Sequence, residues 1–224
     1  MERLLIFDAY GTLISTGTGS IEATKKILSL QEKEIDAVAF YADWKKYHKK
    51  HLDDANRTVF LSERDIFTKD LRVLYEYYQI ARPYETDVKI MLESLMNRKV
   101  FAETIEVVEQ LRKKHRVVIG STTDTEPLLQ NMLYNNLMVD EVYTSEMIKK
   151  YKPDKEFYQY ILRCEKSEPE ETVFIGDSLI DDIAGPQSVG IKTVLINRGK
   201  NLNLTDIQPD YVVTDLREMK RICL

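Results

Sequence analysis

The sequence predicts an α/β fold in which a parallel sheet forms the core and a bundle of helices is inserted near its N-terminus. Two observations support this prediction. Beyond about residue 100, short apolar runs alternate with helical periods, and such alternation is typical of parallel strands joined by right-handed crossovers. Between about residues 20 and 98, in contrast, only helical periods occur.

The first strand is expected at Leu4–Phe7, which is a continuous apolar run. Strands of a parallel sheet are covered on both faces, so they are apolar throughout rather than alternating. In the helical block, Ser62 and Asp65 have the spacing of a capping box, with Asp in place of Glu. The four helices expected in this block are Ile21–Leu30, Glu32–Leu52, Ser62–Ile80 and Tyr84–Asn97.

The second block supplies the rest of the sheet and its covering helices. The strand at 4–7 has no partner before this block, so the helical bundle is expected to be an insertion. We predict a Rossmann-like core of residues 1–14 and 99–224, with a helical cap domain over 15–98. The expected helices are Thr104–Lys114, Glu126–Tyr134, Lys155–Cys164 and Asp181–Ser188, and the expected strands are Arg116–Gly120, Glu141–Thr144, Thr172–Ile175, Lys192–Ile196 and Tyr211–Val213.

Composition narrows the class of partner. The 224 residues carry a formal net charge of −5, with acidic and basic residues mixed along the chain. This argues against an electrostatic binder of nucleic acid or membranes and favours the chemistry of small molecules. The two cysteines lack metal-type spacing, and no apolar run approaches a signal sequence or a membrane span. We therefore expect a cytoplasmic protein.

The first two strand ends carry a carboxylate and a group of hydroxyls. Asp8 directly follows the strand at 4–7, and Ser121-Thr122-Thr123-Asp124 follows the strand at 116–120. Open α/β sheets bind ligands at the carboxyl ends of their strands, and hydroxyls beside a helix start can hold an anion. Each group could instead cap the element that follows it, because Ser, Thr and Asp are common in turns and at helix starts.

Two later strand ends carry a lysine and an acidic cluster. Lys152 lies just ahead of a helix, and Gly176–Asp182 carries Asp177, Asp181 and Asp182. Taken singly, a lysine is most often exposed, and aspartates often cap a helix. Together, however, the strand ends supply the carboxylate, hydroxyl, lysine and acidic pair that a metal-assisted attack by an aspartate requires.

These motifs resemble those of the haloacid dehalogenase-like hydrolase superfamily, in the subclass with a helical cap between the first and second motifs. The resemblance implies a hydrolase in which Asp8 attacks the substrate to form a covalent ester or acyl phosphate that water then cleaves. It covers nearly the full chain and rests on FDAYGTL at Phe7–Leu13, GSTTD at Gly120–Asp124, YKPD at Tyr151–Asp154 and GDSLIDD at Gly176–Asp182.

The resemblance also implies which residues bind the substrate. Lys152 is expected to be catalytic together with Asp8, since it offsets the charge of the nucleophile and binds the anionic part of the substrate. The remaining residues that we expect to contact the substrate follow the same strand ends, and they are Tyr10, Thr12, Ser121 and Thr122.

A metal ion is implied in the phosphatases of this superfamily. Mg²⁺ would be held by Asp8, by the backbone carbonyl of Tyr10 and by Asp177. Asp182, and less directly Asp181, would supply further acids. Oxygen ligands, few of them from the protein, suit Mg²⁺.

Tyr10 departs from the phosphatase pattern, which usually has a second Asp two residues after the nucleophile to act as general acid and base. A phenol titrates near pH ~10, so tyrosine cannot readily replace that Asp. Tyr10, together with Tyr158, resembles the 2-haloacid dehalogenases, whose halide leaves without a proton. Against that function, those enzymes need no metal, and an arginine follows their cap tryptophan, whereas Lys45 follows Trp44 here.

The function predicted from the sequence is therefore a Mg²⁺-dependent phosphatase of small phosphorylated metabolites. The alternatives are a 2-haloacid dehalogenase or a catalytically weak binding member of the same family. Within the cap, the spacing of Trp44 with Phe40 and Tyr47 predicts a core position for the tryptophan. His48 and His51 are expected to be solvated on the cap face.

Overall fold

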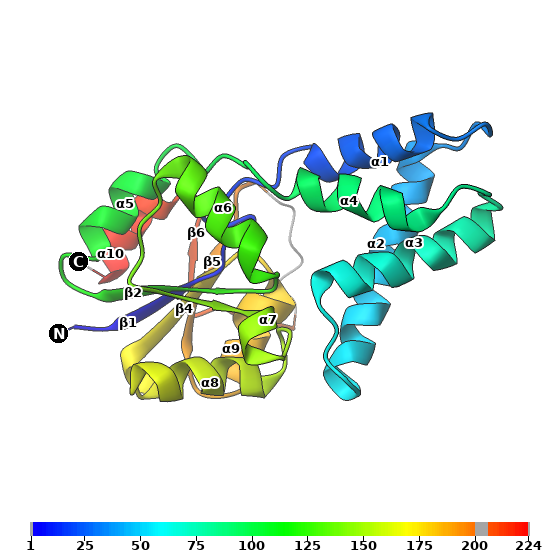
Figure 1. The fold of residues 1–224 in the computed structure, drawn as a ribbon. Helices are drawn as coiled ribbons and strands as arrows, with labels where there is room; N and C mark the ends of the chain where they lie inside the picture. Colours follow the sequence, from blue (N-terminus) through cyan, green and yellow to red (C-terminus); the bar gives the residue numbers. More distant parts are fainter. Residues whose placement is uncertain (1, 200–205, 224) are drawn as a thin grey trace.

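A computed structural model describes residues 2–199 and 206–223, and it confirms the predicted α/β class. Figure 1 shows a sheet with helices on both faces, and four helices, α1 to α4, that stand together to one side of it. We call α1–α4 the helical lobe and the sheet with its covering helices the sheet lobe. Within the described part of the chain, no helix is long and apolar enough to cross a membrane.

The sheet has six parallel strands in the order β3-β2-β1-β4-β5-β6. The first strand is therefore central, with β2 on one side and β4 on the other, and the carboxyl ends of these three strands lie side by side. All six predicted strands are present, and their bounds are β1 Leu4–Phe7, β2 Arg116–Ser121, β3 Glu141–Thr144, β4 Thr172–Gly176, β5 Lys192–Ile196 and β6 Tyr211–Val213.

Alternate residues of β1 pack on opposite faces of the sheet. Leu5 and Phe7 belong to the core formed with α5, α6 and α10, whereas Leu4 and Ile6 belong to the core formed with α8. Burial on both faces explains why the strand is apolar at every position. The covering helices are α5 Thr104–Leu111, α6 Thr125–Asn135, α8 Lys155–Glu165 and α10 Met219–Cys223.

The helical lobe has a hydrophobic core of its own, to which Phe40, Trp44, Leu71 and Met91 contribute. Trp44 is only 2% exposed, so its predicted core position is confirmed. The predicted capping box is also formed, since the Ser62 and Asp65 side chains each accept a hydrogen bond from the other residue's backbone amide. The four helices are α1 Gly19–Ser29, α2 Ala37–Arg57, α3 Glu63–Tyr78 and α4 Tyr84–Ser94.

Two predicted helices differ most from those observed, and the ends of the other predicted helices lie within three residues of the observed ends. Helix α2 begins five residues later than expected, because the Asp36 side chain caps it by accepting hydrogen bonds from the amides of Val38 and Ala39. The helix expected at 181–188 is a π turn, η2 (Leu179–Ala184), followed by the short α9 (Gly185–Gln187). Elements too short to show a period were not predicted, namely α7 Ser145–Ile148, η1 Pro169–Glu171, η3 Leu216–Glu218 and α10.

Candidate active site

Three predicted site residues meet in direct contact at the carboxyl edge of the sheet. Asp8 follows β1, Lys152 lies between α7 and α8, and Asp182 lies in η2 after β4. The Lys152 ammonium donates to Asp8 Oδ1 at 2.8 Å and to Asp182 Oδ1 at 2.7 Å. Asp8 and Lys152 are only 6% and 7% exposed. The lysine that composition alone would place in solvent is thus buried between two carboxylates.

Asp177 completes a group of carboxylates around Asp8. Ligand oxygens of Asp8, Asp177 and Asp182 lie within 4.8 Å of one another. Asp177 approaches the turn after β1 closely, because a Cβ on Gly11 would lie 2.4 Å from Asp177 Oδ2. Gly11 also has a φ of +97°, a conformation that side chains disfavour. The glycine of the first motif therefore makes room for the acid of the fourth.

The donor set at this edge fits a hard divalent cation. Asp8 Oδ2 is buried and has no hydrogen-bond partner, and such an orphan polar atom is costly unless something binds it. Asp182, in contrast, uses both of its oxygens, since Oδ1 accepts from Lys152 and Oδ2 accepts from the amides of Asp177 and Ser178. In this geometry Asp182 fixes Lys152 and the loop of Asp177, while Asp8 offers an oxygen for a metal.

The electrostatics of the cluster favour additional positive charge. Burial raises the pKa of Asp8 to about 7, with Lys152 opposing the shift and the carboxylates of Asp182 and Asp177 adding to it. Burial disfavours the charge on Lys152, but Asp182 and Asp8 outweigh it and raise the pKa of the lysine. The ammonium of Lys152 is therefore shared between the buried carboxylates of Asp8 and Asp182, and the half-buried Asp177 adds further negative charge beside Asp8.

The predicted hydroxyl groups also lie at this edge. Ser121 is the last residue of β2, beside β1, and it is buried. The hydroxyls of Thr12 and Thr122 are buried without a hydrogen-bond partner. Unsatisfied donors at neighbouring strand ends are the groups that an anionic substrate could engage.

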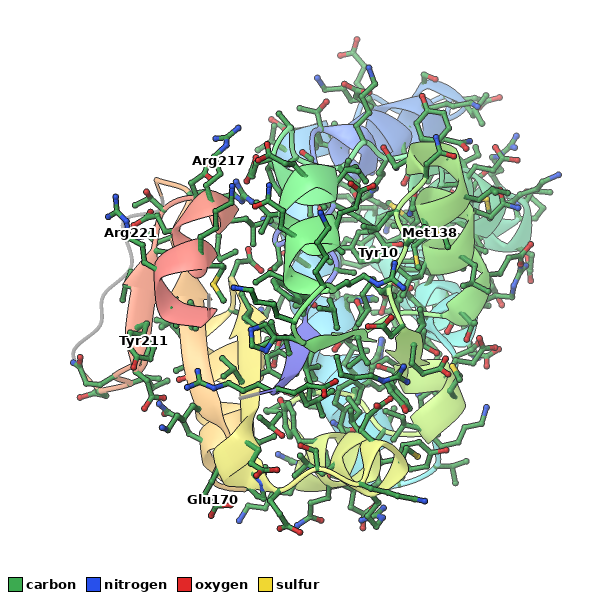
Figure 2. The ribbon with its side chains drawn as sticks, turned by 90° about the vertical axis from the view of Figure 1, so that its left-hand side faces the viewer. Tyr10, Met138, Glu170, Tyr211, Arg217 and Arg221 are labelled. Atoms are coloured by element: carbon green, nitrogen blue, oxygen red, sulfur yellow. The ribbon has the colours of Figure 1, made fainter. Side chains whose placement is uncertain are left out.

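Tyr10, labelled in Figure 2, turns its side chain toward α6. Its hydroxyl accepts a hydrogen bond from Asn131 Nδ2 at 2.8 Å, and the Arg98 guanidinium lies 5.7 Å from the ring centroid. Burial, with the charge of Glu63 adding to it, raises the pKa of Tyr10 to about 12. The phenol is thus a poorer acid here than a free tyrosine.

Tyr158, the second residue that resembled the dehalogenases, is fully buried in the core beneath α8. Its hydroxyl donates to the backbone carbonyl of Asp181, and a Cβ on Gly185 would lie 2.1 Å from that hydroxyl. Tyr158 therefore packs against η2 and α9 and helps to hold the acidic loop.

The two lobes are joined by a reciprocal pair of acidic side chains. The Asp124 carboxylate accepts hydrogen bonds from the amides of Glu63 at 2.8 Å and Arg64 at 3.2 Å, and so caps α3. In return, Glu63 Oε2 accepts from Thr123 Oγ1 at 3.0 Å and from the Asp124 amide at 3.4 Å. Asp124 stands at the start of α6, as predicted, but its side chain caps a helix of the other lobe.

A second buried charge cluster lies inside the helical lobe. Asp70 is 0% exposed and accepts hydrogen bonds from Trp44 Nε1 at 3.1 Å, His48 Nδ1 at 2.7 Å and His51 Nδ1 at 2.6 Å. The prediction that His48 and His51 are solvated is therefore wrong. His51 is buried and His48 is half-buried, because a buried carboxylate needs donors and the facing helix supplies them.

A cavity of about 250 Å³ lies in the helical lobe. Trp44 and Phe67 contribute to its apolar lining, and Lys45, His48 and Glu63 contribute to its polar lining. The sequence did not predict the side-chain contacts of Glu63 with Thr123, of Asp70 with His51, or of Asn131 with Tyr10. Their only sequence signal was an acid or amide on a helix that otherwise shows an ordinary amphipathic pattern.

Comparison with known families and proteins gives consistent matches. The model of the haloacid dehalogenase-like hydrolase family matches residues 2–190. A protein of Pyrococcus furiosus named glyceraldehyde 3-phosphate phosphatase is 31% identical over 49% of this chain and 49% of its own length. A protein of the same name from Methanocaldococcus jannaschii is 30% identical over 76% of this chain and 70% of its own. The chain thus spans about half of the first relative and 70% of the second.

Dehalogenases also match, at lower identity. (S)-2-haloacid dehalogenase 4A of Burkholderia cepacia is 24% identical over 96% of this chain and 89% of its own. A crystal structure of an L-2-haloacid dehalogenase superposes with a TM-score of 0.82 at 20% identity over the whole of both chains. A putative hydrolase of Bacillus subtilis bound to magnesium superposes with a TM-score of 0.79 at 20% identity, over 99% of this chain and 98% of that one. At these identities the structural matches establish the fold alone.

Proposed function

The chain belongs to the haloacid dehalogenase-like hydrolases, and on that premise we propose that it is a Mg²⁺-dependent phosphatase of small phosphorylated metabolites. The observation that carries the proposal is the position of Asp177 beside Asp8. Carboxylates of Asp8, Asp177 and Asp182 lie within 4.8 Å of one another, and Lys152 is the ammonium partner of Asp8 and Asp182. Such an excess of negative charge is repulsive unless a cation binds.

In the proposed reaction, Asp8 attacks phosphorus and displaces the alcohol, forming an acyl phosphate that water then hydrolyses. Lys152 holds Asp8 at 2.8 Å and neutralises part of the charge that gathers there. Ser121 and the unpartnered hydroxyls of Thr12 and Thr122 bind phosphoryl oxygens.

Mg²⁺ would be held by Asp8, Asp177 and the backbone carbonyl of Tyr10, with Asp182 oriented behind them. When bound, Mg²⁺ reduces the repulsion between the nucleophile and the phosphoryl oxygens. The magnesium-bound Bacillus subtilis protein of the same fold supports this choice of metal. The two relatives named as phosphatases support a phosphate ester as the substrate.

The division into lobes is part of the proposal. A core of residues 1–14 and 99–224 carries the reacting groups, and a cap of residues 15–98 selects the leaving group and excludes water. The cavity of the helical lobe, to which Glu63 contributes beside Thr123 of the core, supports this division.

A second candidate function is hydrolysis of 2-haloacids, which Tyr10 favours because a halide leaves without a proton. The Burkholderia cepacia relative supports it. The two functions differ in metal dependence, since a dehalogenase has no use for a cation beside Asp177.

The proposal is tested by measuring phosphate release from p-nitrophenyl phosphate and halide release from L-2-chloropropionate, each with Mg²⁺ and with EDTA. We expect phosphate release that EDTA abolishes and that the Asp8→Asn variant lacks. Halide release that is indifferent to EDTA would replace the proposal with the dehalogenase function. No turnover of either substrate would indicate a binding protein.

A further inference from the structure

Glu63 brings a carboxyl group from the helical lobe to the catalytic edge of the sheet lobe. It is the first residue of α3 and lines the cavity of that lobe. Its Oε2 atom accepts from Thr123 Oγ1 at 3.0 Å and from the Asp124 amide at 3.4 Å. Thr123 lies two residues beyond Ser121, where the phosphoryl group is proposed to bind. Glu63 therefore holds a carboxyl group against the residues that directly follow the proposed phosphate-binding hydroxyl, while it also lines the cavity of the helical lobe.

We infer that Glu63 is the general acid and base of the phosphatase reaction, in the role that Tyr10 cannot fill. The inference rests on the proposed function. Tyr10 and Glu63 share a partner, because the Tyr10 hydroxyl and the Glu63 carboxylate both interact with the Thr123 hydroxyl. The Glu63 carboxylate thus lies close to the hydroxyl of Tyr10, with Thr123 as their common neighbour.

The chemistry balances with this one residue added. As the Asp8 carboxylate forms its bond to phosphorus, the bond from phosphorus to the ester oxygen breaks and protonated Glu63 gives its proton to that oxygen. Water then attacks the acyl phosphate, and the Glu63 carboxylate accepts a proton from it. Phosphate leaves, and Asp8 and Glu63 return to their starting states.

The surroundings of Glu63 suit a group that must carry a proton. Burial raises its pKa and Asp124 raises it further, while His48 and the bonds from Thr123 and the Asp124 amide lower it. A raised pKa keeps the acid protonated to a higher pH than an ordinary glutamate. The charged or titratable groups that face Glu63 come from several elements and are Tyr10 after β1, His48 on α2, Arg98 before α5, Asp124 before α6 and Tyr151 before α8.

Glu63 could instead serve only to join the lobes through its bonds with Thr123 and Asp124. Two variants separate these roles. Glu63→Gln keeps an oxygen that can accept from Thr123 and from the Asp124 amide, but it has no carboxyl proton. Asp124→Ala removes the cap of α3 and weakens the contact between the lobes, but it leaves the Glu63 carboxyl in place.

The experiment measures kcat for p-nitrophenyl phosphate and for sn-glycerol 3-phosphate in both variants. Nitrophenolate leaves without a proton, whereas an alkoxide requires one. Glu63→Gln should therefore lower kcat for the alkyl ester about 100-fold more than for the aryl ester. Because Asp124 raises the pKa of Glu63, the two esters are compared at a pH below that pKa, where Asp124→Ala should lower both values of kcat to the same extent. In the wild type, kcat for the alkyl ester should fall as pH rises through the pKa of Glu63, and this limb should be absent from Glu63→Gln.

An equal loss on both esters in Glu63→Gln would overturn the inference and leave Glu63 as a contact between lobes. Glu63→Asp serves as a second variant if Glu63→Gln folds poorly. A larger ratio of kcat for the alkyl ester to kcat for the aryl ester in Glu63→Asp than in Glu63→Gln supports the acid role. Absence of any Asp8-dependent turnover of p-nitrophenyl phosphate would defeat the proposed function itself, and the inference with it.

Discussion

The cluster around Lys152 in the sheet lobe and the cluster around Asp70 in the helical lobe differ in how completely their polar atoms are hydrogen-bonded. In the sheet lobe, Lys152 bonds to Asp8 and Asp182, Asp177 lies close to both carboxylates, and Asp8 Oδ2 has no hydrogen-bond partner. In the helical lobe, both oxygens of Asp70 accept hydrogen bonds, one of them from two donors. A buried cluster with an orphan oxygen and excess negative charge indicates a place where something must bind.

The helical-lobe cluster, in which both Asp70 oxygens are hydrogen-bonded, has a structural role instead. Asp70 on α3 ties together Trp44, His48 and His51 of α2. Breaking such a network leaves several buried donors unpaired, so it fixes how the two helices pack. The comparison predicts that variants of the sheet-lobe cluster change the chemistry most, and that variants of the helical-lobe cluster change stability alone.

The largest expected effect comes from removing the nucleophile. Asp8→Asn preserves the shape of the side chain, and Lys152 keeps its bond to Asp182, so the fold should persist. Turnover of p-nitrophenyl phosphate with Mg²⁺ should fall at least about 1,000-fold, as for other nucleophile variants. Turnover within tenfold of the wild type would show that Asp8 is not the nucleophile.

Removing the cation of the sheet-lobe cluster should cause the largest loss of stability. Lys152→Met leaves Asp8 and Asp182 buried without their counter-charge. The free energy of unfolding, measured with urea in EDTA, should fall by about 3–5 kcal/mol.

A matched control lies two residues away. Lys150 is more exposed and pairs with Asp154 at 3.1 Å, so Lys150→Met should cost less than about 1 kcal/mol. Equal losses of unfolding free energy in Lys152→Met and Lys150→Met would show that Lys152 stabilises the buried carboxylates no more than an exposed ion pair does.

The helical-lobe cluster can be broken at its anion. Asp70→Asn leaves at least one of its donors from Trp44, His48 and His51 without an acceptor. The free energy of unfolding should fall by about 2–3 kcal/mol, with amides of α2 and α3 losing most protection from hydrogen exchange. The value of kcat for p-nitrophenyl phosphate should stay close to the wild-type value.

The control for that variant is Asp43→Asn. Asp43 is half-buried and accepts a hydrogen bond from the Tyr78 hydroxyl at 2.7 Å, so its loss should cost less than about 1 kcal/mol. A large fall in kcat for Asp70→Asn, absent from this control, would contradict a purely structural role for the helical-lobe cluster.

The smallest effect is expected from the Tyr10 side chain, which turns away from the sheet-lobe cluster toward Asn131. Tyr10→Phe removes the acceptor for Asn131 Nδ2, which keeps its second bond to the carbonyl of Leu95. The stability should fall by about 1 kcal/mol, and kcat for sn-glycerol 3-phosphate should hardly change. A strong fall in that kcat would identify the phenol as the acid and displace Glu63 from the role.

The same contrast explains what the sequence could predict. Parallel strands end at one edge, so Asp8, Ser121 and Asp177 had to lie near one another once their strands were recognised. The position of Lys152 near this edge was predicted from its place after the strand at 141–144, but its burial and its direct contacts with Asp8 and Asp182 do not follow from that rule. The chemical roles of these residues remain predictions that the experiments above test.

The helical lobe was less predictable in its polar contacts. Its four helices and the Ser62 capping box follow from periodicity and local spacing. The bond between Asp70 and His51 depends on how α2 rotates against α3, and no local pattern determines that rotation. The contact of Glu63 with Thr123 depends on how the two lobes pack against each other, and local sequence patterns predict that packing even less.

The most direct test of the account follows the oxygen of water during turnover in H₂¹⁸O. The tryptic peptide of residues 4–25 contains Asp8, and its mass reports whether that carboxylate has exchanged. If water attacks phosphorus of an acyl phosphate, ¹⁸O appears in the released phosphate and the peptide keeps its mass. If ¹⁸O enters Asp8, water has attacked the carboxyl carbon of an ester, as haloacid hydrolysis through Asp8 requires, and the phosphatase account is contradicted.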